Sequence, residues 1–269
     1  MPTAPEAGSQ KLPSDDILLR IQAALSAARE VFQDFTPGKV AAEYKAGHDP
    51  VTLADTAVDA VLRKALQRDG EGWLSEETPD DFERLSKRRL WVVDPLDGTR
   101  EFVEGVPEFS VSIGLVEDGW PVAGGILNPV TAEVFLGSAA GVTYNGKPAH
   151  TSRRDSLAGA TVLASRSESK RGEWKRFESA EFMVKAVGSV AYKLALVSAG
   201  LADATFTLTP KHEWDIAGGV ALVRGGGGAA WTLENSAVRF NNRSLLVSGL
   251  VACGARLRGP LMQLIEGKS

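Results

Sequence analysis

The chain has 269 residues, 43% of them hydrophobic and 24% charged, and its formal net charge at pH 7 is −4. This composition excludes a disordered, collagen-like or coiled-coil protein, and the near-balanced charge gives no electrostatic reason to bind a nucleic acid polymer or a membrane. Cys253 is the only cysteine, the N-terminus lacks the layout of a signal peptide, and no apolar run reaches the roughly 20 residues that span a bilayer. We therefore expect a cytoplasmic protein.

The first part of the chain predicts an extension followed by two helices. Residues 1–14 are small, polar and proline-containing, which is typical of a mobile extension. Apolar residues recur at helical spacing over 17–32, with Ser14 and Asp15 placed to cap the start. A second amphipathic helix is predicted up to residue 66, with Thr52 or Asp55 at its front.

A series of strands follows the two helices. Apolar or alternating segments predict strands at residues 73–74, 90–93, 109–115 and 122–127. Ser110, Ser112 and Gly114 alternate with apolar residues, as in a strand with one buried face. The Asn145-Gly146 pair predicts a tight hairpin.

The second half alternates between strands and helices. Strands are predicted at 161–164, 182–187, 204–208 and 245–252, and helices at 192–199, 216–223 and the C-terminus. This order indicates a layered α/β protein with sheets between helices. We predict one compact unit with an N-terminal α+β half, residues 15–150, and a C-terminal α/β half, residues 151–269.

The most specific motif is the segment Val92-Val93-Asp94-Pro95-Leu96-Asp97-Gly98-Thr99. Two carboxylates directly after a buried strand are costly unless their charge is compensated. Pro95 turns the chain, and Gly98 permits close approach of the backbone before a helical turn whose amides face the same point. Such a segment can hold a hard cation on carboxylates beside a phosphate on N–H groups. An isolated pair of this spacing is more often a helix cap plus a turn.

Further acidic residues favour the cation site. Glu76 and Glu77 follow a predicted strand, and Asp215 lies at the front of a predicted helix. If Glu76, Asp94, Asp97 and Asp215 converge, each pair costs about 3 kcal/mol at about 5 Å and an effective dielectric of about 20, so cations or protons must neutralise them. Oxygen ligands without a His or Cys cluster favour Mg²⁺.

Other chemistries are weakly supported. The segment 141–148 nearly matches a phosphate-binding loop, but Pro148 stands where a Ser or Thr would bind magnesium. The glycines at 225–228 lack the strand-to-helix setting of a dinucleotide site. The three histidines form no zinc-protease motif, and no serine-hydrolase motif is present.

The motifs together resemble the inositol monophosphatase family of magnesium-dependent, lithium-sensitive phosphatases. The resemblance is carried by Trp91–Thr99, by Glu76-Glu77 upstream and by Trp214-Asp215-Ile216-Ala217-Gly218 downstream, and it extends from about Ile17 to the C-terminal helix. The residues 94–102 look closest to the CysQ-like branch, which removes the 3′-phosphate from 3′-phosphoadenosine 5′-phosphate. The resemblance implies a sugar-phosphatase-like fold with alternating α-β-α-β-α layers, two to three Mg²⁺ ions, inhibition by Li⁺ and a small phosphate ester as substrate. A homodimer is also compatible with it.

The resemblance also implies a role for individual residues. The first Mg²⁺ would be held by Glu76, Asp94 and the Leu96 carbonyl; the second by Asp94, Asp97 and Asp215; Glu76 would help to hold a third. Asp55 and Thr99, with Glu76, would form the catalytic group that orients and deprotonates water. The remaining implied contacts are with substrate: Lys45, Asp97, Gly98, Thr99, Gly188, Ser189 and Asp215.

The substrate stays open at this point. Ser75 stands where many members have Gly, and Gly218 stands where Ala is common, which loosens a substrate assignment but removes no ligand. Inositol 1-phosphate, histidinol phosphate and sugar phosphates are alternatives to the bisphosphate nucleotide. Cations in segments that could line the substrate mouth are more often solvated surface residues: Arg166, Lys170, Lys193, Lys211 and His212. An alternative of another class is a non-catalytic module that binds Mg²⁺ or a phosphate ligand.

Overall fold

The computed structural model describes residues 15–44 and 50–266. The extension predicted for residues 1–14 lies outside these residues, as does Lys45. None of the helices in the described part of the chain is long and apolar enough to cross a membrane.

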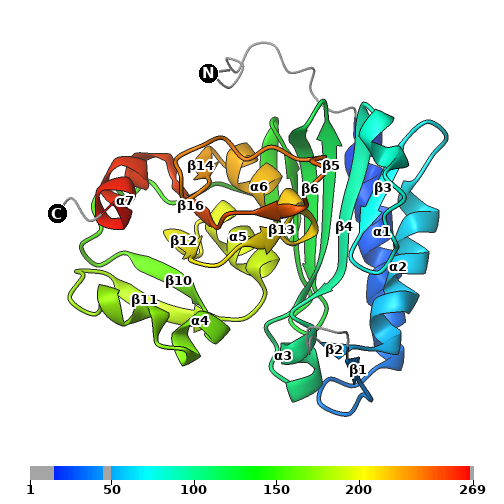
Figure 1. The fold of residues 1–269 in the computed structure, drawn as a ribbon, viewed down its shortest axis with the longest axis horizontal. Coiled ribbons are helices and arrows are strands. Elements are labelled where there is room, and N and C mark those ends of the chain that lie inside the picture. The colour runs from blue at the N-terminus through cyan, green and yellow to red at the C-terminus, as the bar shows by residue number, and fades with distance from the viewer. Residues whose placement is uncertain (1–14, 45–49, 267–269) are drawn as a thin grey trace.

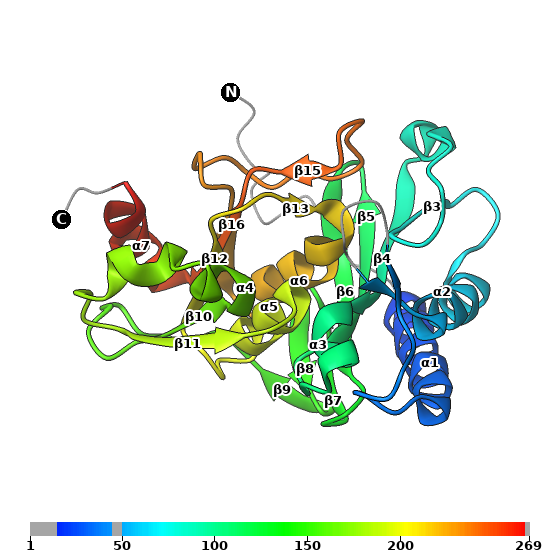
Figure 2. The ribbon, with the colours of Figure 1, turned by 60° about the horizontal axis from the view of Figure 1, so that its bottom comes forward.

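Five layers make up the fold (Figure 1). Helices α1 (Asp15–Val31) and α2 (Leu53–Leu66) cover one face of a seven-stranded sheet. Helices α5 (Val190–Ser198) and α6 (Glu213–Gly225) lie between that sheet and a five-stranded sheet. Helix α7 (Arg258–Ile265) lies beyond the five-stranded sheet, far from α1 and α2 (Figure 2). The short helix α4 (Arg166–Lys170) directly follows one strand of that sheet. This order confirms the predicted α-β-α-β-α fold class.

The strands of the large sheet run in the spatial order β3-β4-β5-β6-β7-β8-β9, with only β3 and β4 parallel. Their bounds are β3 (Gly72–Ser75), β4 (Arg89–Asp97), β5 (Ser110–Glu117), β6 (Trp120–Asn128), β7 (Glu133–Ser138), β8 (Gly141–Tyr144) and β9 (Lys147–Ala149). The turn between β8 and β9 is the predicted Asn145-Gly146 hairpin, and both residues have positive φ.

The smaller sheet has the order β11-β10-β12-β16-β14. Its strands are β10 (Thr161–Ser165), β11 (Met183–Val187), β12 (Ala204–Thr207), β14 (Gly228–Trp231) and β16 (Leu250–Gly254). Two short pairs complete the strands: β1 (Glu43–Tyr44) with β2 (Pro50–Val51), and β13 (Lys211–His212) with β15 (Leu246–Val247). The single strand predicted at 245–252 is therefore two, because Gly249 at φ +69° turns the chain between β15 and β16.

The interior is divided by the two sheets. One cluster of buried apolar side chains lies between α1, α2 and the large sheet, a second around α5 and α6, and a third beneath α7. The large sheet ends at Ala149 and the small sheet begins at Thr161, while α5 contacts strands of both sheets. The division into two halves near residue 150 stays a prediction.

The expectation for β5 was wrong on one point. Ser110, Ser112 and Gly114 are buried like their apolar neighbours, because α6 packs on the face that they form. A Cβ on Gly218 of α6 would lie 2.6 Å from the Ile113 carbonyl oxygen, and one on Gly124 would lie 2.3 Å from the Gly218 oxygen. The helix can therefore approach the sheet this closely only with glycine at these positions. This contact places the first turn of α6 beside the end of β4.

Candidate active site

The paired acids Asp94 and Asp97 lie at the end of β4, where the pairing with β5 is irregular. Asp94 faces Ser112 and Asp97 faces Ser110, so β4 has one more residue than β5 between these pairs. The strand therefore does not end at Asp94, as the sequence suggested, but continues through Asp97. Such a bulge re-aims side chains at the end of a strand. Its effect here is that both carboxylates lie on the wall of one cavity.

Gly98 connects this strand to the short helix α3 (Thr99–Glu104). Its φ of +97° is a conformation that favours glycine, and a Cβ there would lie 3.1 Å from the Cβ of Phe109. The turn brings the Thr99 hydroxyl within 2.9 Å of the Leu96 carbonyl oxygen and 3.2 Å of Asp55 Oδ1.

Asp55 lies behind Thr99. The Thr52 amide and hydroxyl each donate to Asp55 Oδ2 over 2.7 Å, which closes the predicted cap of α2. The carboxyl is 2% exposed, and burial raises its pKa although the hydrogen bonds from Thr52 oppose that shift. Asp55 does not line the cavity itself and reaches it only through Thr99.

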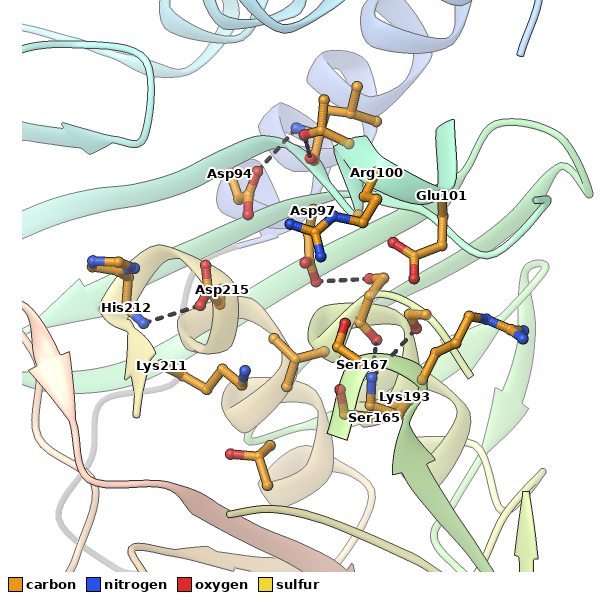
Figure 3. Close-up of a pocket in the computed structure, with 18 of the residues that line it drawn as sticks. Asp94, Asp97, Arg100, Glu101, Ser165, Ser167, Lys193, Lys211, His212 and Asp215 are labelled. Carbon is orange, nitrogen blue, oxygen red and sulfur yellow. Dashed lines mark hydrogen bonds between the residues drawn. The ribbon is translucent and has the colours of Figure 1, made fainter. Parts of the chain in front are cut away.

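A cavity of about 380 Å³ opens between the two sheets. Figure 3 shows Asp94, Asp97 and Asp215 around one side of it and Lys193 and Lys211 opposite. Nine residues with a predicted site role line this cavity: Glu76, Asp94, Leu96, Asp97, Gly98, Thr99, Gly188, Ser189 and Asp215. Segments far apart in the sequence therefore contribute to one site.

Five carboxylates line this cavity, Glu101 in addition to the four predicted ligands, and they act on one another electrostatically. Burial raises the pKa of Asp94 well above its usual value, and the charges of Glu76, Asp97 and Asp215 raise it further. The pKa of Asp215 is likewise raised well above its usual value by burial and then by Asp97 and Glu76. In neutral solution this cluster needs protons or cations to offset its charge.

The donor set of the cavity fits Mg²⁺. The four carboxylates and the Leu96 carbonyl offer hard oxygen atoms, and their mutual repulsion would be relieved by a divalent cation. Within residues 15–44 and 50–266, no three Asp, Glu, His or Cys side chains are yet close enough together to hold one ion. The carboxylates therefore line one side of the cavity, and their side chains would have to move closer together to coordinate one ion.

Asp97 joins the end of β4 to α5. Its Oδ2 atom accepts from the Ser189 hydroxyl over 2.7 Å and from the Ala191 amide over 2.6 Å, at the first turn of that helix. Burial raises the pKa of Asp97, whereas these two bonds and the charges of Lys193 and Lys211 hold it down. Asp215 has a similar place on α6, where it accepts from the His212 amide over 3.0 Å.

The opposite wall of the cavity is rich in cations. It contains Lys193 and Lys211 (Figure 3), and Arg166 and Arg171 also line the cavity, together with four hydroxyl residues, Ser165, Ser167, Thr207 and Thr209. Arg100 and His212 line it as well, on the side of the carboxylates, beside Asp97 and Asp215. Lys170, which was also a candidate for this wall, does not line it. The interpretation of Lys193 as a solvated surface residue was wrong, because it is 2% exposed and burial lowers its pKa to about 8.

Two buried glutamates that the sequence did not single out support this wall. Glu168 accepts from the amides of Leu208 and Thr209 and from the Trp174 indole, which ties α4 to the loop after β12. Glu213 accepts from the amides of Asn241 and Asn242 at the start of α6. Nothing in their spacing distinguishes them from surface acids.

The sequence profile of the Inositol monophosphatase family matches residues 14–266, nearly the whole chain. The chain belongs to the inositol monophosphatase family. An inositol-1-monophosphatase of Mesorhizobium japonicum is 32% identical over 251 residues, which are 88% of this chain and 93% of that protein. It follows that this member of the family is an enzyme, a magnesium-dependent phosphatase acting on phosphoric monoesters, and the non-catalytic alternative is set aside.

Solved structures of the family share the fold. The SuhB protein of Bartonella henselae has 27% sequence identity and a TM-score of 0.79, and the alignment covers 94% of this chain and 99% of that one. CysQ from Bacteroides thetaiotaomicron has 26% identity and a TM-score of 0.75, with 90% and 98% covered. The relatives therefore include the CysQ-like branch as well as proteins named for inositol monophosphate.

Proposed function

We propose that this phosphatase hydrolyses a small phosphate monoester by direct attack of a water molecule activated by Mg²⁺. The observation that carries the proposal is that the four predicted carboxylate ligands line one cavity together with Thr99, whose hydroxyl is hydrogen-bonded to Asp55 behind it. The Ser189 hydroxyl in the cavity donates to Asp97, but Asp97 is proposed here as a metal ligand and not as a general base, so the proposal includes no phosphorylated enzyme. Hydrolysis in ¹⁸O-water should place the label in phosphate, and a trapped aspartyl-phosphate would contradict it.

In this proposal Glu76, Asp94 and the Leu96 carbonyl hold one Mg²⁺, and Asp94, Asp97 and Asp215 hold a second. Glu76 also helps to hold a third, looser ion. Because Oδ2 of Asp97 already accepts two hydrogen bonds, Oδ1 is the atom available to the cation. Bound Mg²⁺ supplies a Lewis acid that lowers the pKa of a coordinated water and offsets charge on the phosphoryl oxygens.

The chain's own residues handle the proton. The Thr99 hydroxyl faces both the cavity and Asp55 Oδ1. We assign it a relay in which Thr99 Oγ1 takes a proton from the attacking water while its own proton moves to Asp55. The raised pKa of the buried Asp55 carboxyl suits it to accept that proton. The amides of Gly98 and Thr99 bind the phosphate, and Gly188 and Ser189 contact the organic half.

Our first choice of substrate is 3′-phosphoadenosine 5′-phosphate. Arg166, Arg171 and Lys211 line the same cavity as the carboxylates, which suits a second anionic group on the substrate. Inositol 1-phosphate is the second candidate, because the Mesorhizobium relative is named an inositol-1-monophosphatase. Histidinol phosphate and sugar monophosphates carry a single phosphate, so they would offer these cations no second anionic group.

The substrate is tested by comparing kcat/KM for the three esters at one Mg²⁺ concentration. The proposal predicts the highest value for 3′-phosphoadenosine 5′-phosphate, and a larger loss on this ester than on inositol 1-phosphate when Lys211 is changed to Met. A preference for inositol 1-phosphate would replace the first candidate by the second. Inhibition by Li⁺ is expected with either substrate.

A further inference from the structure

The turn before α5 has an unusual backbone. Ser189 has φ +51° and ψ 122°, a combination that an L-residue adopts only when its surroundings enforce it. Its hydroxyl donates to Asp97 Oδ2 over 2.7 Å and accepts from the Tyr192 amide over 2.9 Å. The Ser110 hydroxyl lies 3.0 Å from the Ser189 hydroxyl oxygen. The position of Asp97 is therefore tied to this turn.

Lys193 holds the turn from within the protein. Its ammonium group donates to the carbonyl oxygens of Val187, Gly188 and Ser189 over 3.1, 3.4 and 2.8 Å. A lysine ammonium has three protons, so these bonds use its whole donor capacity. Because three carbonyl groups of one turn accept hydrogen bonds from one nitrogen, Lys193 stabilises the unusual backbone conformation at Ser189.

We infer that Lys193 is a positioning residue, which fixes the Ser189 turn and through it the orientation of the Asp97 carboxylate. The inference rests on the proposed role of Asp97 as a magnesium ligand. With Oδ2 held by Ser189 and Ala191, the carboxylate cannot rotate freely, and Oδ1 is kept available on the cavity side. Groups that orient metal ligands in this way affect metal affinity strongly.

A direct contact between Lys193 and the substrate is the competing role. Lys193 lines the cavity, and its charge would suit an anionic group. To bind one, however, the ammonium group would have to give up a hydrogen bond to the turn, because all three of its protons are used. The two roles differ in what changes on mutation: Mg²⁺ affinity in the first, KM for an anionic substrate in the second.

The experiment measures Mg²⁺ binding by titration calorimetry and steady-state kinetics at saturating Mg²⁺ on the full chain. Lys193→Met and Ser189→Ala are compared with Lys193→Arg, which can restore part of the hydrogen bonding. The matched control is Ser198→Ala, since the Ser198 hydroxyl is also buried in α5 but donates to Ala195 at the far end. Asp97→Asn reports separately on the proposed ligand.

Lys193→Met and Ser189→Ala are each expected to weaken Mg²⁺ binding by about 10- to 100-fold. The double variant should bind Mg²⁺ no more weakly than the single variant with the lower affinity. Lys193→Arg should recover part of the lost affinity, and Ser198→Ala should bind Mg²⁺ like the wild type. Unchanged Mg²⁺ affinity in Lys193→Met, with a higher KM for a bisphosphate only, would overturn the inference. If Asp97→Asn itself bound Mg²⁺ normally, the proposed ligand set would fail instead.

Discussion

The Thr99 hydroxyl lies 3.2 Å from Asp55 Oδ1, although 44 residues separate the two in the chain. Thr99 begins α3 at the cavity, whereas Asp55 is buried in the first turn of α2. Asp55 also accepts two hydrogen bonds from Thr52, so its carboxylate is fixed from both sides. The pair thereby connects the cavity to a buried base that does not line it.

Thr99→Ala is expected to reduce kcat by about 100- to 10,000-fold, because it removes the proton relay but no proposed metal ligand. Mg²⁺ affinity should stay within about twofold of the wild type. Thr99→Ser keeps the hydroxyl and should recover most of the activity. The measurement is steady-state kinetics with Mg²⁺ titration of each variant, and a Thr99→Ala enzyme with normal kcat would contradict the relay.

Asp94→Asn is expected to lower kcat by more than about 100-fold and to weaken Mg²⁺ binding. Asp94 is 1% exposed and is the carboxylate assigned to both ions, so no other side chain can replace it. Calorimetric titration and turnover at limiting Mg²⁺ measure the two effects. Near-normal turnover of Asp94→Asn at limiting Mg²⁺ would contradict the proposed site.

Asp94→Asn should impair activity but increase the stability of the metal-free protein. Burial, and then repulsion by the other carboxylates, raises the pKa of Asp94 in the folded protein above its usual value near 3.8. Its stabilising contribution is therefore complete below about pH 3.8 and is lost as pH rises through the raised folded pKa. In EDTA, Asp94→Asn should be more stable than the wild type at pH 8, and the difference should shrink on acidification.

Urea unfolding of both proteins over a pH series measures this difference. Saturating Mg²⁺ should reverse the order at pH 8, because the wild type then gains binding free energy that the variant lacks. A difference in unfolding free energy that does not depend on pH would show that Asp94 is not a strained carboxylate in the metal-free protein.

The close contact of α6 with the large sheet predicts a stability effect. A Cβ on Gly218 would lie 2.6 Å from the Ile113 carbonyl oxygen, so Gly218→Ala should destabilise the fold by about 1–3 kcal/mol. Gly259 in α7 is the control, since a Cβ there meets nothing within 4 Å. Gly259→Ala should be neutral or stabilising by at most about 1 kcal/mol. Chemical denaturation compares the two, and equal effects would contradict the packing argument.

Much of the fold can be predicted from local patterns. The helix front at Thr52 and Asp55 and the Asn145-Gly146 hairpin follow from capping and turn preferences that act within a few residues. The alternation in β5 was misleading, because a polar face on a strand indicates solvent only when no helix covers it. Here α6 covers Ser112 and Gly114.

The site is predictable where its residues form compact motifs. Asp94 and Asp97 are three residues apart in the sequence. Two carboxylates so close together after a buried apolar segment already indicate a common cation site. Lys193 could not be assigned in the same way, because its hydrogen-bond partners are backbone carbonyls. The conformation of the turn that presents these carbonyls cannot be read from the residue types in it. For Asp55, the sequence predicted a position at the front of α2. Its position behind Thr99 could not be predicted, because it depends on how the first turns of α2 and α3 pack together.

The central claim is that Glu76, Asp94, Asp97 and Asp215 bind divalent cations in the cavity between the sheets. Anomalous X-ray diffraction from a crystal soaked in Mn²⁺ tests it most directly, because Mn²⁺ takes the oxygen ligands of Mg²⁺ and can be located without ambiguity. The account predicts two or three peaks in the cavity, with the four carboxylates drawn toward them. Peaks only at surface acids, with this cavity left without metal, would contradict it.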